Sequence, residues 1–80
     1  MKLPRDISGV DLAKALGRLG YEIRHQTGSH IRLTTQRDGE HHLTIPAHET
    51  LRVGTVGAII RDLAEHYQLS REELLEELFQ

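Results

Sequence analysis

Three segments of alternating apolar and polar residues between positions 21 and 46 constrain the fold of this chain most strongly. A period of two is typical of a half-buried β-strand. The segments are residues 21–26, 30–35 and 41–45. Short turns join them, with Thr27-Gly28 in the first connection and Asp38-Gly39 in the second. Parallel strands need a crossover of about a dozen residues or more, so these strands are predicted to form an antiparallel meander.

The phase of this alternation predicts which side chains share a face of the sheet. One face carries the apolar residues Ile23, Ile31, Leu33, Leu43 and Ile45. The other face carries Arg24, His30, Arg32, Thr34, His42 and Thr44. Helices that pack on the apolar face leave the second face open to solvent. Two arginines and two histidines are therefore predicted to lie together on an exposed sheet surface.

A helix is predicted on the N-terminal side of the strands. Ser8 is its expected N-cap, and Gly20 is expected to end it. Between them, Leu12, Leu16 and Leu19 recur at helical spacing and define the side that faces the core.

Two further helices are predicted after the strands. The first begins at Gly54-Thr55 with Thr55 as its cap, and the second is short and begins with a capping box made by Ser70 and Glu73. The apolar stripe of the longer helix is Val56, Ile59, Ile60, Leu63, Ala64 and Tyr67. The predicted fold class is therefore α+β. A three-stranded antiparallel sheet has its helices on one face, in the order α-β-β-β-α plus a short C-terminal helix.

Length and composition narrow the class of protein. Eighty residues make one domain, expected to span 1–80, and the absence of cysteine excludes disulfides, zinc–thiolate sites and a cysteine nucleophile. The first residues lack the apolar run of a secretory signal, and no stretch approaches the ~20 apolar residues of a membrane span. The expected location is the cytoplasm, with no membrane partner.

The charge of the chain is divided unevenly. The formal net charge is −2, but residues 1–69 hold nine Lys and Arg against eight Asp and Glu, so the acidic excess lies in the last eleven residues. A near-neutral body binds RNA only through local clusters of arginine, and such binding is sensitive to salt.

Short motifs follow one another along the whole chain in a fixed order. They are Lys2-Leu3-Pro4-Arg5, Ser8-Gly9, Leu19-Gly20-Tyr21, Gly28-Ser29-His30, Ile45-Pro46 with His48, Gly54-Thr55 with Ile59-Ile60-Arg61, and Leu69-Ser70-Arg71-Glu72-Glu73. None is specific alone, but the series resembles the HicA family of toxins from bacterial toxin–antitoxin pairs. The resemblance implies a fold like the double-stranded-RNA-binding domain. It also implies an mRNA interferase that cleaves mRNA, arrests translation and is inhibited by a HicB-like antitoxin, with His30 of the Gly-Ser-His motif as the catalytic residue.

The chemistry of RNA cleavage suits a histidine. The 2′-hydroxyl of RNA is a built-in nucleophile, so cleavage needs a base, an acid and stabilisation of charge on the phosphate, and an imidazole transfers protons readily near neutral pH. We predict His30 as the general base or acid, with Arg24 or Arg32 pairing the phosphate. His42, by proximity, and His48, by motif position, are candidates for the second proton-transfer group. The scheme needs neither a metal ion nor another cofactor.

Other residues have a binding interpretation beside a structural one. Gly28 and Ser29 are turn residues that also let RNA approach the sheet, and Ser29 lacks a base behind it that would make it a nucleophile. Lys14 and Arg18 are candidates for the RNA backbone, and they serve equally well to keep a helix soluble. The same two interpretations hold for Arg52 and Arg61. The helix start at Gly54-Thr55 is suited equally to holding a phosphate and to simple capping.

A metal site is the weaker interpretation of the remaining histidines. His41, His42 and His48 lie close in sequence, but neighbouring residues of a strand point to opposite faces. Without cysteine or an HExxH spacing, a solvated polar edge is the better interpretation.

Three functions are consistent with the sequence. The first is a ribonuclease toxin that needs no metal. The second is a module of the same fold that binds RNA without cutting it, and the third is a scaffold that binds a HicB-like protein and has lost catalysis. The Gly28-Ser29-His30 motif favours the first.

Overall fold

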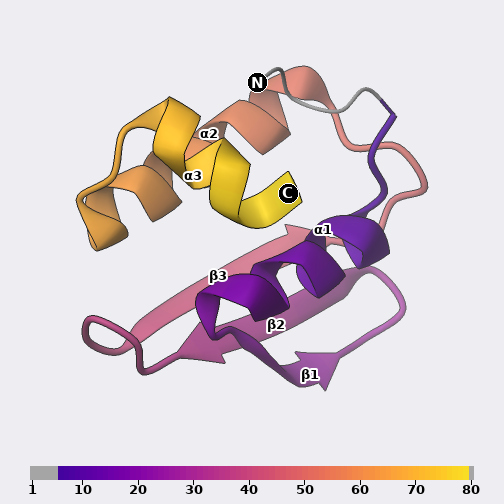
Figure 1. Cartoon of the computed structure of the whole chain (residues 1–80). Coiled ribbons are helices and arrows are strands. Elements are labelled where there is room, and N and C mark those ends of the chain that lie inside the picture. The colour runs from indigo at the N-terminus through magenta and orange to yellow at the C-terminus, as the bar shows by residue number, and fades with distance from the viewer. Residues whose placement is uncertain (1–5, 80) are drawn as a thin grey trace.

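The computed structural model describes residues 6–79, and it has the predicted element order. Helix α1 and a turn of 3₁₀ helix, η1, precede the strands, and helices α2 and α3 follow them (Figure 1). The elements are α1 Gly9–Leu16, η1 Gly17–Leu19, β1 Glu22–Gln26, β2 His30–Thr35, β3 His41–Pro46, α2 Val53–Tyr67 and α3 Arg71–Phe79. The strands form one antiparallel sheet in the order β1-β2-β3, which confirms the α+β meander. The motif Lys2-Leu3-Pro4-Arg5 lies outside the described residues.

The first helix begins where the sequence predicts, but its α-helical part ends at Leu16, before the predicted end at Gly20. The Ser8 side chain accepts a hydrogen bond from the Asp11 backbone N–H at 3.0 Å, which is a regular N-cap. The chain tightens into η1 after Leu16, and Gly20 stops it with a φ of 91°, a backbone conformation that glycine adopts without strain.

The two later helices are confirmed, with one shift. Helix α2 begins at Val53, and its N-cap is Arg52, which makes no side-chain capping bond. Thr55 therefore lies inside the first turn and is not the cap. The capping box of α3 is present, because Ser70 and Glu73 exchange hydrogen bonds of 3.0 and 3.1 Å.

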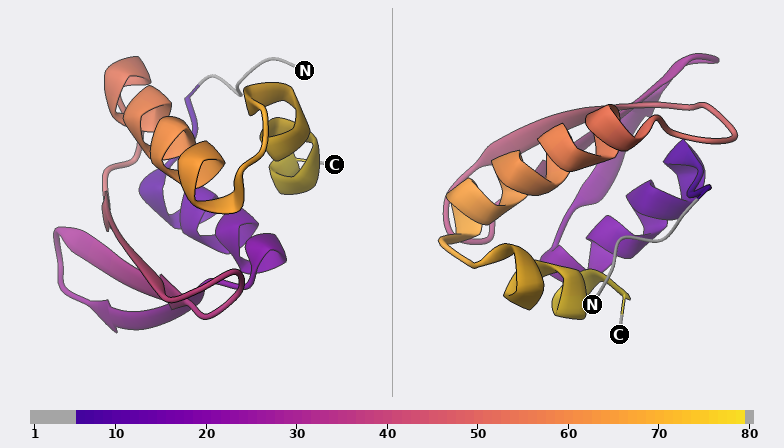
Figure 2. Two further views of the ribbon diagram at one scale, coloured as in Figure 1. Left: turned by 90° about the vertical axis from the view of Figure 1, so that its left-hand side faces the viewer. Right: turned by 90° about the horizontal axis from the view of Figure 1, so that it is seen from above.

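All three helices lie on one side of the sheet (Figure 2). Helix α1 packs over β2 and β3, and α3 packs against α1, η1 and α2. The fully buried side chains of the core include Leu12, Leu16, Leu19, Ile31, Leu33, Ile45, Ile60, Leu63, Leu74, Leu75 and Leu78. Among residues 6–79, no helix has the length and apolar content that crossing a membrane requires.

The apolar face of the sheet agrees with the prediction in β2 and β3 and departs from it in β1. Ile31 pairs with Ile45, and Leu33 pairs with Leu43, and all four are buried. Ile23 is 50% exposed, so the prediction that it belongs to the core is wrong. All five residues of β1 are exposed, since this edge strand extends beyond the cover of the helices.

Gly9 is the point at which α1 meets the end of β3. Its backbone N–H donates to the His48 carbonyl at 2.9 Å, and a Cβ at this position would overlap the carbonyl oxygen of Pro46. Pro46 in turn pairs with His30 across the sheet. The close approach explains the Ser8-Gly9 motif physically, because only glycine allows the helix to dock there.

Candidate functional site

His30 is the first residue of the central strand, and it faces the side of the sheet that the helices leave uncovered. The next residue, Ile31, is buried beneath the helices, and side chains alternate along a strand, so His30 and Arg32 both point outward. Both are exposed. We call this uncovered side of the sheet the open face.

The turn before His30 fixes the orientation of its ring. The Thr27 hydroxyl accepts hydrogen bonds from the backbone N–H of Ser29 at 3.4 Å and of His30 at 3.1 Å. The Thr27 backbone N–H donates to the His30 carbonyl at 2.9 Å. The Ser29 hydroxyl lies 3.0 Å from Nδ1 of His30. Nδ1 is thereby engaged within the protein, and Nε2 is the nitrogen left for an external group.

Arg32 and Arg24, the two predicted phosphate partners, differ in their surroundings. Arg24 forms an ion pair with Glu22, with 3.6 Å between Nη1 and Oε2. Arg32 forms no ion pair with any residue of the range 6–79. The Arg32 guanidinium can therefore bind a phosphate beside His30 directly, whereas Arg24 must first break its ion pair with Glu22.

The structure does not bring His42 to His30. His42 pairs with Thr34, four residues further along β2, which is about 13 Å at the rise of a strand. Its Nδ1 lies 2.8 Å from the Thr34 hydroxyl, and its Nε2 lies 3.4 Å from the Glu40 carboxylate. Hydrogen bonds from Gln36 and from His42 lower the pKa of Glu40. Thr34 also faces this side, but it is buried, so its predicted exposure is wrong.

His48 lies in the loop that follows β3, near the start of β2. The Ala47 N–H donates to the Ser29 carbonyl at 2.9 Å, so this loop runs alongside the Gly28-Ser29-His30 turn. The His48 side chain is exposed. The structure therefore brings the backbone of two family motifs together, although they are far apart in the sequence.

His25 is a residue of the open face that the alternation missed. Strict alternation puts residue 25 in phase with Ile23, on the apolar face, but β1 contains a bulge between Ile23 and His25. The bulge adds one residue to the strand, so His25 pairs with Arg32 and shares its face. No glycine marks the bulge in the sequence, so the sequence held no clear signal of it.

The predicted helical cations lie away from His30. Lys14 and Arg18 belong to the α1–η1 segment, on the opposite side of the sheet, and Arg18 donates to the Leu78 carbonyl at 3.5 Å. Gly28 is exposed, and a Cβ there would meet open space, as expected of a turn. Contacts of Lys14 or Arg18 with RNA would require a second surface.

The remaining two histidines form a cluster under α2. His41 and His66 stack with their ring centroids 4.4 Å apart, and Tyr67 packs edge-on to His66. Nδ1 of His41 lies 2.6 Å from the Tyr21 hydroxyl, and its Nε2 lies 3.3 Å from the Asp62 carboxylate. We call Tyr21, His41, Asp62, His66 and Tyr67 the histidine cluster.

The histidine cluster is built for structure. The Asp62 carboxylate only accepts, so Nε2 of His41 donates to it, and in the neutral ring Nδ1 then accepts from the Tyr21 hydroxyl. Burial, with a smaller contribution from Tyr67, raises the pKa of the Tyr21 hydroxyl, which stays protonated as a donor. Among residues 6–79, no group of three His, Asp or Glu side chains could hold a metal ion.

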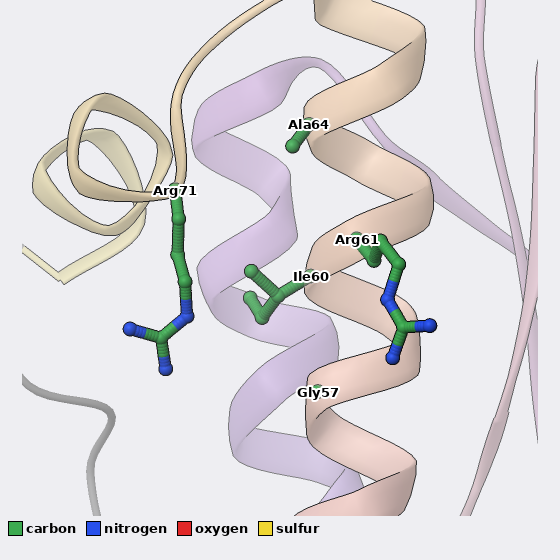
Figure 3. A pocket seen from close by; sticks show the side chains of 5 residues that line it. All are labelled: Gly57, Ile60, Arg61, Ala64 and Arg71. Atoms are coloured by element: carbon green, nitrogen blue, oxygen red, sulfur yellow. The ribbon is translucent and has the colours of Figure 1, made fainter.

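A groove of about 290 Å³ lies between α2 and the start of α3 (Figure 3). Its lining is Gly57, Ile60, Arg61, Ala64 and Arg71. None of these side chains transfers protons near neutral pH, so the groove lacks the general acid or base that the histidines of the open face can provide.

Comparison with protein families gives one finding. The model of the family described as HicA toxin of bacterial toxin-antitoxin matches residues 9–64, from the first turn of α1 to the last turn but one of α2. The matched range contains Gly28-Ser29-His30 and every other residue of the open face discussed above. Searches of curated proteins and of solved structures give no match.

Proposed function

The chain belongs to the HicA toxin family of bacterial toxin–antitoxin systems, and we propose that it is an endoribonuclease that cleaves mRNA with His30 as its catalytic residue. The observation that carries this proposal is the setting of His30. The ring is exposed on the open face, Ser29 engages Nδ1, and Nε2 is available to a ligand. An imidazole so placed presents Nε2 to the solvent side of the sheet, where the ribose hydroxyl of a bound RNA would lie.

The reaction follows from the chemistry of RNA. One group takes the proton of the 2′-hydroxyl as its oxygen bonds to phosphorus, and another gives a proton to the 5′-oxygen as that bond breaks. The products are a 2′,3′-cyclic phosphate and a 5′-hydroxyl. His30 performs one of the two proton transfers through Nε2, and Arg32 stabilises the charge on the phosphate. No step needs a metal ion, because the nucleophile belongs to the substrate.

Membership of a toxin–antitoxin family implies a protein partner, the antitoxin. A toxin of a toxin–antitoxin pair has an antitoxin, and we propose that here it is HicB-like and covers the open face. An antitoxin that covers the exposed turn before His30 would inhibit the enzyme directly. We propose that the protein acts in the cytoplasm, where it would meet mRNA and the antitoxin.

Growth arrest and cleavage by purified protein test the catalytic proposal together. We expect wild-type protein, expressed without antitoxin, to stop growth and to cut RNA. We expect His30→Gln to lose at least about 100-fold of the cleavage rate and to lose toxicity while it remains folded. His66→Gln is the matched control, since it makes the same change on the covered side of the sheet.

Two results would contradict the proposal. A folded His30→Gln variant that stays fully toxic and active would refute the role of His30. Wild-type protein that binds RNA, or the antitoxin, without cutting RNA would favour the non-catalytic RNA-binding or antitoxin-binding module instead.

The antitoxin proposal has its own test. Reaction of exposed histidines with diethyl pyrocarbonate, followed by mass spectrometry of peptides, should label His30 in the free toxin and not in its complex with the antitoxin. A complex in which His30 reacts as fast as in the free toxin would show that the antitoxin acts elsewhere.

A further inference from the structure

We infer that His25 is the second proton-transfer group of RNA cleavage, acting together with His30 across the strands β1 and β2. This inference rests on the proposed function. It replaces His42 and His48, the two candidates that the sequence suggested.

The bulge in β1 is the structural basis of the inference. Ile23 pairs with Leu33 toward the helices, and after the bulge Gln26 pairs with the buried Ile31. His25 pairs with Arg32 between these two points. Paired residues of antiparallel strands project to the same face, so His25 lies on the open face beside Arg32.

The spacing of the three side chains suits one phosphate group. Arg32 is two residues from His30 on β2, and His25 is directly across from Arg32. His25 and His30 are therefore diagonal neighbours on one face, a relation with about 7–8 Å between the residues. Two rings that each approach a different oxygen of one phosphate must stand on opposite sides of it, at about this separation, and Arg32 is a direct neighbour of both.

The surroundings of His25 leave it available. Its side chain is exposed, and the imidazole makes no hydrogen bond or ion pair with any residue of the range 6–79. His42 is further from His30, and both of its ring nitrogens have partners. His48 lies in a loop beyond the end of β3, on the side of His30 away from Arg32. Of the three histidines, His25 alone is paired with Arg32.

The proton balance of the step is complete with two histidines. One ring gains the 2′-hydroxyl proton as the new oxygen–phosphorus bond forms. The other ring loses a proton to the departing 5′-oxygen as the old bond breaks. Exchange with water then restores both rings, so no further reactant is needed.

The experiment uses the purified full chain and two RNA substrates of the same sequence. One substrate is ordinary RNA, and in the other the 5′-bridging oxygen at the cleaved bond is replaced by sulfur. A thiolate departs without a proton, so a variant that lacks only the general acid regains its rate on the sulfur substrate. The variants are His25→Gln and His30→Gln, with His42→Gln and His48→Gln as the rival assignments.

We expect both His25→Gln and His30→Gln to lose about 100-fold or more on ordinary RNA. One of these two variants, and not the other, should return to near the wild-type rate on the sulfur substrate. His25 is exposed on an uncovered strand, so His25→Gln should melt at the wild-type temperature.

The outcomes separate the two proposals. An active wild type with a His25→Gln variant of equal activity, or with the loss and rescue in His42→Gln or His48→Gln instead, would overturn the role of His25 and leave that of His30 intact. Loss in His25→Gln with rescue of neither variant, or of both, would also overturn it. A wild type that cleaves no RNA would instead remove the proposed function.

Discussion

The histidines of this protein lie in two regions that make opposite use of the same side chain. On the open face, His25 and His30 are exposed, and Nε2 of His30 is free to meet a ligand. In the histidine cluster, His41 is held by Tyr21 and Asp62 and stacked on His66. The imidazoles of the first region are therefore available for proton transfer, whereas those of the second region connect the sheet to α2.

The difference shows that packing, not residue type, decides where chemistry can take place. A histidine with both nitrogens bonded within the protein contributes to stability, and removing it leaves its partners unsatisfied. A histidine with one nitrogen held and the other open is oriented but not occupied. Activity and stability should therefore depend on different histidines.

The largest expected effect comes from making the same change, histidine to glutamine, once in each region. His30→Gln should lower the rate of RNA cleavage by about 10²–10⁴-fold at an unchanged melting temperature. His41→Gln should do the reverse, with normal cleavage by the folded protein and a loss of about 1–3 kcal/mol in the free energy of unfolding. Cleavage assays and thermal melts of both variants check this, and a loss of activity in both would erase the distinction.

Gly9→Ala should lower both stability and cleavage, because Gly9 docks α1 against the loop beside His30. The new Cβ overlaps the Pro46 carbonyl, so the helix or the loop has to shift. Overpacking of this kind costs about 1–3 kcal/mol. We expect a lower melting temperature together with weaker cleavage by the folded protein. Gly17→Ala is the matched control in the same segment, since its Cβ would meet open space; equal melting temperatures of the two variants would contradict the role of Gly9.

Tyr21→Phe probes the histidine cluster through pH. The pKa of Tyr21 is raised in the folded protein above its unfolded value of about 10, so the folded state favours the protonated hydroxyl. This contribution is present below about pH 10 and is lost as the pH rises toward the folded pKa. Wild-type protein should lose stability in this alkaline range more steeply than Tyr21→Phe. Parallel curves in denaturant titrations between about pH 8 and 11 would contradict the assignment.

The smallest expected effect concerns the uncovered strand β1. Ile23 is half-exposed, so Ile23→Thr should change the free energy of unfolding by less than about 0.5 kcal/mol. Leu33→Ala, in the residue that pairs with Ile23 and is fully buried, should cost about 2–5 kcal/mol. Denaturant titrations of the pair measure how far the helices cover the sheet, and similar losses in both would show that β1 is covered.

Much of the fold follows from local patterns in the sequence. Some elements are specified by residues within or next to them. The strands β2 and β3 follow from their own alternation, α1 from the Ser8 cap, and α3 from the capping box of Ser70 and Glu73. The short connections then leave the antiparallel order as the one consistent arrangement.

The parts that the sequence did not predict depend on distant contacts. The bulge of β1 shifts His25 to the open face and has no glycine to mark it. Ile23 is exposed because the helices do not reach over β1. Thr34 is buried, and its hydroxyl contacts the His42 ring on the neighbouring strand. Periodicity describes a strand alone and contains no information on its neighbours.

The central claim is that imidazoles on the open face drive attack by the ribose 2′-hydroxyl, and the ends of the RNA fragments test it most directly. Purified wild-type protein, incubated with a defined RNA, should leave a 2′,3′-cyclic phosphate on one fragment and a 5′-hydroxyl on the other, as mass spectrometry of the products would show. Fragments that carry a 5′-phosphate would mean that water is the nucleophile, and they would contradict the account.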